Sequence, residues 1–207
     1  MFITFEGGEG SGKTTQIELL SKYLISKSHK VYLTREPGGT EGAENIRKLL
    51  VTGNPEKWDA KTEALLMYAS RLDNYERLIK PNLNKGYIVI SDRFADSTRV
   101  YQGLVGGISE IEIEELHGFC LGNFDPDLTF VLDIDVEQGL LRANSRNNNE
   151  NRFESKGFEF HDLVRKGYLK LANKYKRMHV IDATMTVKAI NSNIVQIIET
   201  YLNENNK

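Results

Sequence analysis

The sequence predicts an α/β protein in which a five-stranded parallel sheet is flanked by helices. Segments with strand-like and helix-like periodicity alternate along the whole chain. Several strand segments, such as YIVIS at 87–91, are continuous apolar runs, which are typical of parallel strands covered on both faces. A glycine-rich turn at 7–14 joins the first strand to the first helix. Such alternation builds a doubly wound layer through right-handed crossovers.

The expected elements follow one another without a linker or an internal repeat, so residues 1–207 are expected to form a single domain. We expect strands at residues 2–5, 30–34, 87–91, 128–133 and 178–181. We expect helices at 14–26, 41–50, 61–80, 97–104, 109–121 and 187–202, with a further helix starting at 136. The longest of them should end near Pro81, because proline lacks the backbone N–H that a helix interior requires.

Composition narrows the classes of function. Hydrophobic residues make up 40% and charged residues 27% of the chain, as in ordinary globular proteins. The net charge of −2 gives no basis for a nucleic-acid or anionic-membrane partner. Cys120 is the single cysteine and lies between apolar neighbours, which favours a packed residue in a reducing compartment. Neither a signal peptide nor an 18-residue apolar span is present, so a cytoplasmic location is expected.

The turn at 7–14 reads GGEGSGKT and matches G-x-x-x-x-G-K-[ST]. Its glycines let backbone N–H groups converge on an anion, and the following helix points its positive end at the same place. Lys13 reaches the outer phosphates, and the Thr14 hydroxyl can ligate Mg²⁺. The sequence therefore predicts a nucleoside triphosphate site.

Charged and glycine residues follow two further strands, at the sheet edge where parallel sheets bind ligands. The stretch TREPGG at 34–39 is either a second phosphate cradle or a structural turn. Asp92 and Arg93 follow the strand at 87–91 and suit Mg²⁺ and phosphate contacts, although a salt-bridged strand cap is the alternative. Arg47 is either a phosphate ligand or a solvated helix charge.

Two helices carry candidates for recognising a base or sugar. Arg71 lies on an otherwise apolar helix face, so it is either paired internally or directed at a ligand. Tyr101 and Gln102 supply an aromatic ring and an amide, although a tyrosine at helical spacing also suits a core position.

The polar, asparagine-rich segment 144–154 cannot bury a core, so it is expected to be a mobile loop. It is either a solvated turn or part of a lid, at about 142–156, that closes arginines over the transferring phosphate. Arg142, Arg146 and Arg152 lie in or beside it.

Six stretches together resemble the bacterial thymidylate kinases over essentially the whole chain. They read FEGGEGSGKTT, TREPGGT, TEALLMYASR, SDRFADSTRVYQG, DPDLTFVLD and RFESKGFEF. The resemblance implies a P-loop NTPase fold with a lid. It also implies phosphorylation of dTMP to dTDP with ATP and Mg²⁺ in DNA precursor synthesis, and usually a homodimer.

The resemblance also implies residue roles. ATP binding would fall to Gly7, Gly8, Glu9, Gly10, Ser11, Gly12, Lys13, Thr14 and Thr15, with Thr14 and Asp92 at the metal. The dTMP-binding residues would be Arg35, Glu36, Arg47, Met67, Arg71, Arg93, Thr98, Tyr101 and Gln102. Catalytic roles would fall to Glu6, Lys13, Arg93 and the lid residues Arg152 and Arg146, with Arg152 favoured over Arg146.

Three positions depart from the family pattern. Met67 stands where a phenylalanine usually stacks on thymine, and Phe94 replaces the tyrosine of a DRY motif. Glu9 stands where some members carry an arginine, and members without that arginine place catalytic arginines in the lid. This departure directs the search for catalytic charge to the lid.

Two alternatives remain beside this reading. Another P-loop nucleotide kinase or a deoxynucleoside kinase would share the phosphate loop, but a nucleoside acceptor carries no phosphate for several arginines to neutralise. A GTPase-type switch would require N-K-x-D, and neither Asn84-Lys85 nor Asn173-Lys174 is followed by aspartate at the right place.

Overall fold

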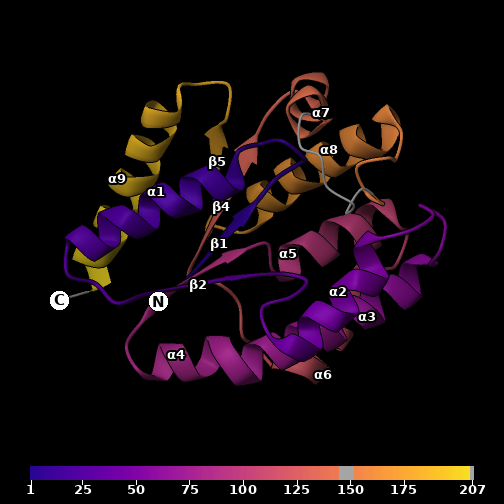
Figure 1. Cartoon of the computed structure of the whole chain (residues 1–207), viewed down its shortest axis with the longest axis horizontal. Coiled ribbons are helices and arrows are strands. Elements are labelled where there is room, and N and C mark those ends of the chain that lie inside the picture. The colour runs from indigo at the N-terminus through magenta and orange to yellow at the C-terminus, as the bar shows by residue number, and fades with distance from the viewer. Residues whose placement is uncertain (145–151, 206–207) are drawn as a thin grey trace.

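The computed structural model describes residues 1–144 and 152–205, and its centre is an all-parallel sheet (Figure 1). The five strands lie in the order β2–β3–β1–β4–β5. They are β1 (Phe2–Glu6), β2 (Val31–Arg35), β3 (Ile88–Asp92), β4 (Leu128–Asp133) and β5 (Met178–Asp182). The predicted five-stranded parallel sheet is confirmed, and each strand lies within one residue of its predicted bounds.

Helices cover both faces of the sheet. They are α1 (Lys13–Ser26), α2 (Glu41–Val51), α3 (Ala60–Asn74), α4 (Lys80–Asn84), α5 (Ala95–Thr98), α6 (Glu110–Leu121), α7 (Val136–Asn144), α8 (Phe158–Lys174) and α9 (Val187–Asn205). Two π-helical segments, η1 (Tyr75–Ile79) and η2 (Arg99–Val105), continue α3 and α5. No helix within residues 1–144 and 152–205 is long and apolar enough to cross a bilayer.

The alternation of side chains along β1 shows how the core is divided. Ile3 and Phe5 face α1 and α9, which lie side by side on one face of the sheet (Figure 1). Phe2 faces the opposite side and packs with α3 and the segment after β3. The strands are thus apolar on both faces, which explains their continuous hydrophobic runs.

The helix predicted at 61–80 does not end near Pro81. It runs through η1 into α4 and ends at Asn84. Pro81 lies in the first turn of α4, where a residue without an N–H is tolerated, and a π-helical turn precedes it.

Helix α8 is absent from the sequence prediction. Its buried positions include His161, Gly167 and Tyr168 beside Val164 and Leu171. Polar and small residues therefore interrupt the apolar stripe from which a helix is recognised.

Candidate active site

The phosphate loop connects β1 to α1 and requires glycine where it meets α7. Gly10 has φ +67°, and a Cβ there would lie 2.0 Å from the backbone oxygen of Gly139. The Nζ of Lys13 donates to the carbonyls of Gly7 at 3.2 Å and Gly8 at 3.0 Å. Burial, together with the nearby Arg93, lowers the pKa of Lys13. The lysine is thus held within the loop that it is predicted to serve.

A cavity of about 260 Å³ opens beside this loop. All nine predicted dTMP-binding residues line it, namely Arg35, Glu36, Arg47, Met67, Arg71, Arg93, Thr98, Tyr101 and Gln102. The loop residues Glu9 to Thr14 and Asp92 line it too. Glu6, Gly7, Gly8, Thr15 and Arg152 do not line it. Segments far apart in the sequence therefore join a triphosphate loop to the predicted acceptor residues.

Arg71 lines the cavity, and one of its nitrogens has no hydrogen-bond partner among the described residues. The Nε of Arg71 donates to Glu36 at 2.7 Å, and its Nη2 donates to the Thr98 hydroxyl at 3.1 Å. Among the described residues, nothing pairs with the buried Nη1. A buried donor without a partner is costly, so this atom is the best-supported contact for a ligand acceptor. Burial raises the pKa of Glu36, although Arg71 opposes the shift.

Arg93 lines the cavity in a strained backbone conformation, with φ +67°. Its Nη1 donates to Tyr168 at 2.8 Å and Ser97 at 3.2 Å, and its Nη2 donates to Glu9 at 2.9 Å. Burial alone raises the pKa of Glu9, but Arg93 and Lys13 hold it below the ordinary value. The Glu9 carboxylate therefore stays ionised between two cations.

Glu6 lies beneath Arg93, fully buried, rather than in the cavity. Its carboxylate accepts hydrogen bonds from the Phe94 backbone at 2.8 Å, the Ser97 hydroxyl at 2.6 Å and the Tyr168 hydroxyl at 3.0 Å. Burial and the nearby Asp96 raise the pKa of Glu6 to about 7. Glu6 is linked to Arg93 by an ion pair at 4.0 Å and by Ser97 and Tyr168, which bind both side chains.

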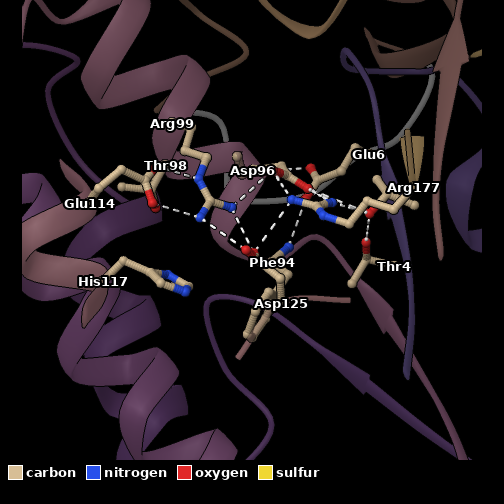
Figure 2. A network of polar contacts seen from close by, with 12 residues as sticks. Thr4, Glu6, Phe94, Asp96, Thr98, Arg99, Glu114, His117, Asp125 and Arg177 are labelled. Atoms are coloured by element: carbon tan, nitrogen blue, oxygen red, sulfur yellow. Dashed lines mark hydrogen bonds and ion pairs between the residues drawn. The ribbon is translucent and has the colours of Figure 1, made fainter. Parts of the chain in front are cut away.

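An ion-pair network anchors the helix that carries Thr98, Tyr101 and Gln102 (Figure 2). Buried Asp96 accepts from Arg99 at 3.1 Å and from Arg177, just before β5, at 2.6 Å. Arg99 also pairs with Glu114 at 2.7 Å and Asp125 at 2.9 Å. These contacts fix the start of the helix against α6 and β5.

The loop after β2 forms the side of the cavity that is predicted to hold the acceptor phosphate. Arg35 makes a two-point contact with Glu44, at 3.0 and 2.9 Å. Arg47 donates to the carbonyl of Pro37 at 2.8 Å. The Gly38 N–H donates to the Ser70 hydroxyl at 3.0 Å, which ties the loop to α3. Two cations therefore line this side of the cavity from neighbouring elements.

Two oxygens at the strand edge fit a hard divalent cation. The Thr14 hydroxyl lies 3.5 Å from a carboxylate oxygen of Asp92. Mg²⁺ prefers oxygen ligands and usually takes one or two from the protein. Residues 1–144 and 152–205 hold no group of three or more His, Cys, Asp or Glu placed to bind a metal. The Thr14 hydroxyl and the Asp92 carboxylate could supply the protein's share of the ligands of a Mg²⁺ ion.

Arg152 does not line the cavity beside the phosphate loop. Its side chain is 0% exposed. Its three nitrogens donate to the carbonyls of Asn54, Leu50 and Pro55, at 3.0, 3.1 and 2.9 Å, and to Glu63 at 2.5 Å. The guanidinium therefore fastens the end of the predicted lid to the chain between α2 and α3. These contacts are with the protein itself, and the catalytic role of Arg152 stays a prediction.

The other two lid arginines differ in position. Arg142 lies on α7, where its Nη1 donates to the carbonyl of Ala183 at 3.4 Å. Arg146 falls within residues 145–151, outside the described residues, and its catalytic role stays a prediction.

Sequence reasoning missed several residues that shape the cavity. Phe153, in the RFE stretch, lines it and meets the edge of the Tyr101 ring at 5.7 Å between centroids. Glu63 lies behind it and accepts from Gln102 at 2.9 Å. The sequence spacing could have indicated Glu63, because Glu63, Met67 and Arg71 follow one another at intervals of four residues and so lie on one face of α3.

Comparison with known proteins agrees with these features. The thymidylate kinase family profile matches residues 5–194. The thymidylate kinase of Ruegeria pomeroyi is 47% identical over 98% of this chain and 96% of that protein. That of Caulobacter vibrioides is 48% identical over 95% of each chain. A crystal structure of thymidylate kinase from Ehrlichia chaffeensis superposes with a TM-score of 0.78 at 35% identity, covering 96% of this chain and 98% of that one.

Proposed function

This chain belongs to the thymidylate kinase family, and we propose that it transfers the γ-phosphoryl group of ATP to dTMP, producing dTDP for DNA precursor synthesis. The observation that carries the proposal is the single cavity shared by the phosphate loop and all nine predicted acceptor residues. The cavity is lined both by Lys13 of the phosphate loop and by Arg71, whose Nη1 has no partner among residues 1–144 and 152–205.

The transfer requires positioning and charge more than covalent participation by the protein. An oxygen of the dTMP phosphate attacks the γ-phosphorus, and the bond to the oxygen bridging β and γ breaks, leaving ADP. Lys13 and Arg93 stabilise the negative charge on the moving group. Arg93 already lies between the loop residue Glu9 and the helix bearing Tyr101, where donor and acceptor meet.

Thr14 and Asp92 would hold Mg²⁺ together with the phosphates, and the ion would supply further charge neutralisation. The Thr14 hydroxyl and Asp92 carboxylate are neighbours at the end of β3, which supports this assignment. Catalytic charge from Arg146 remains part of the proposal.

The arginines favour a phosphorylated acceptor over a nucleoside. Arg35, Arg47 and Arg93 line the cavity from three different elements. Their convergence would have no counterpart on thymidine, which has no phosphate. A deoxynucleoside kinase is therefore the less favoured candidate.

A substrate panel tests the proposal directly. Phosphorylation of dTMP, dUMP, dGMP and thymidine is measured with ATP and Mg²⁺, and dTMP should give the highest kcat/KM. Lys13→Ala serves as the control, since it removes charge stabilisation rather than core packing, and should abolish turnover with an unchanged circular dichroism spectrum. Preference for another acceptor would overturn the assignment.

A homodimer in the cytoplasm completes the proposal. Helix α6 exposes Phe119 by 87% and Ile111 by 71%, an apolar surface that pairing of two copies would cover. Sedimentation velocity measures the assembly state, and a monomer at all concentrations would contradict the dimer. The cytoplasmic location stays a prediction from composition.

A further inference from the structure

Glu63 is a buried acid with two different partners. Its side chain is 8% exposed, and it lies in the first turn of α3. Oε1 accepts from Arg152 at 2.5 Å, and Oε2 accepts from the side-chain amide of Gln102 at 2.9 Å. The carboxylate therefore joins the end of the predicted lid to a residue that lines the cavity.

The contact to Gln102 determines which way its amide points. A carboxylate paired with a buried arginine has no proton to donate, so the NH₂ group of the amide must face Glu63. The carbonyl oxygen is then the group that Gln102 offers on its other side. Gln102 is 1% exposed, so its amide depends mainly on protein and ligand partners for its hydrogen bonds.

The same cavity offers a donor from Arg71, since its Nη1 has no partner within the described part of the chain. Thr98 accepts from Arg71 and lies one helical turn before Gln102, so the donor and the acceptor belong to one surface. A donor beside an acceptor matches the O4 and N3–H groups of thymine. It mismatches cytosine, whose N4 amine is a donor and whose N3 is an acceptor.

We propose that Glu63 is a specificity-determining positioning residue: it holds the Gln102 amide in the orientation that accepts from the base, and Arg152 holds Glu63 in place. Glu63 does not itself touch the base. This inference rests on the proposed dTMP kinase function and adds how the protein rejects cytosine. It also gives Arg152 a role that needs no contact with the phosphate.

Glu63→Gln tests the inference, because it keeps the size of the side chain and removes the charge. The new amide can donate to Gln102, so the Gln102 amide is free to turn its NH₂ group toward the cavity. The ratio of kcat/KM for dTMP to that for dCMP should fall roughly tenfold or more, mainly through a higher KM for dTMP. The KM for ATP should stay unchanged, whereas Glu63→Asp should retain most of the discrimination.

Glu114→Gln is the matched control. Glu114 also pairs with a buried arginine, Arg99, but none of its hydrogen bonds within the described residues reaches a residue that lines the cavity. The Glu114→Gln variant should have a lower melting temperature but the same ratio of kcat/KM for dTMP to kcat/KM for dCMP. The inference is overturned if Glu63→Gln leaves the ratio at the wild-type value, or if Glu114→Gln lowers it equally.

Failure of the inference is distinct from failure of the proposed function. If wild-type protein does not phosphorylate dTMP, the function itself is wrong. If wild-type protein is active and selective while Glu63→Gln remains equally selective, only the role of Glu63 is wrong.

Discussion

Arg71 and Arg152 are the two largest fully buried side chains among the described residues, yet their surroundings differ. All three nitrogens of Arg152 donate to the protein, largely to backbone carbonyls of residues 50–55. Two nitrogens of Arg71 donate hydrogen bonds, and its Nη1 has no partner within residues 1–144 and 152–205. Both arginines are therefore buried, and they differ in how many of their nitrogens have a hydrogen-bond partner.

The difference shows how to interpret a buried cation. An arginine whose three nitrogens all have partners stabilises the fold, because removing its ion-pair partner leaves a buried charge without compensation. An arginine with one free donor has retained the capacity to bind a ligand, and part of its desolvation is recovered only when the ligand arrives. Four measurements can break or sharpen this contrast.

Arg71→Met should produce the largest effect. It removes the free donor and the pair with Glu36, so kcat/KM for dTMP should fall about a thousandfold, equivalent to about 4 kcal/mol of transition-state binding. The KM for ATP should change little. Steady-state kinetics with each substrate varied in turn provides the measurement.

Loss of Arg71 also leaves the buried Glu36 carboxylate without its cation. The single variant could therefore lose activity because the protein is destabilised. The double variant Arg71→Met with Glu36→Gln should regain stability in urea unfolding but not dTMP recognition. If the double variant also recovered activity, Arg71 would be structural and its contrast with Arg152 would disappear.

Arg152→Met should instead reduce stability, by about 3 kcal/mol, since it leaves Glu63 without its cation. Turnover measured well below the melting temperature should stay within a few-fold of wild type. Urea unfolding measures the loss of stability, and kcat measures the loss of turnover. The two together distinguish a structural from a catalytic role of Arg152. A hundredfold loss of kcat with unchanged stability would restore the catalytic role predicted from the sequence.

Glu6 extends the contrast to an acid. Both of its carboxylate oxygens accept hydrogen bonds, and two of the donors, Ser97 and Tyr168, also bind Arg93. Its pKa rises from 4.5 to about 7 on folding, so the folded state binds the proton more tightly than the unfolded chain. The resulting stabilisation is complete below pH 4.5 and is lost as the pH rises through 7, amounting to about 3 kcal/mol.

Urea unfolding of wild type and Glu6→Gln at pH 4.5 and pH 8 measures this contribution. The wild-type protein should lose more stability than the variant between these two values. Equal losses in both proteins would show that Glu6 does not titrate with the raised pKa.

Met67→Phe should give the smallest effect. Met67 lines the cavity one turn before Arg71, where a flat ring can stack on the base. Binding of dTMP should tighten by about 0.5–1.5 kcal/mol, measured by calorimetric titration. Unchanged or weaker binding would mean that the base does not lie against this position.

Much of this architecture was accessible from the sequence because it depends on local chemistry. The glycine spacing at 7–14, the buried strands and the charges at their ends predict the sheet and the cavity lining. The nine acceptor residues came from the resemblance to a family, and the structure places all of them on one cavity. No local pattern connects residues as distant as Arg35 and Gln102.

The remainder depends on contacts that sequence spacing does not reveal. Arg152 sits in a polar stretch typical of a lid, and only the carbonyls of residues 50–55 show that it points inward. Helix α8 escaped recognition because His161 and Gly167 occupy its buried stripe. Asp96 reads as an ordinary helix residue, although two arginines converge on it.

The Glu6 carboxylate also constrains the order in which the molecule acquires activity. It joins β1 to residues 88, 91 and 162 positions further along the chain. Contacts this distant form late in folding, since long loops must close first. We expect Arg93 to reach its place only after α8 has docked on the sheet, because Tyr168 of α8 binds both Arg93 and Glu6. Recovery of kinase activity during refolding should accordingly coincide with the final step rather than with the appearance of helix.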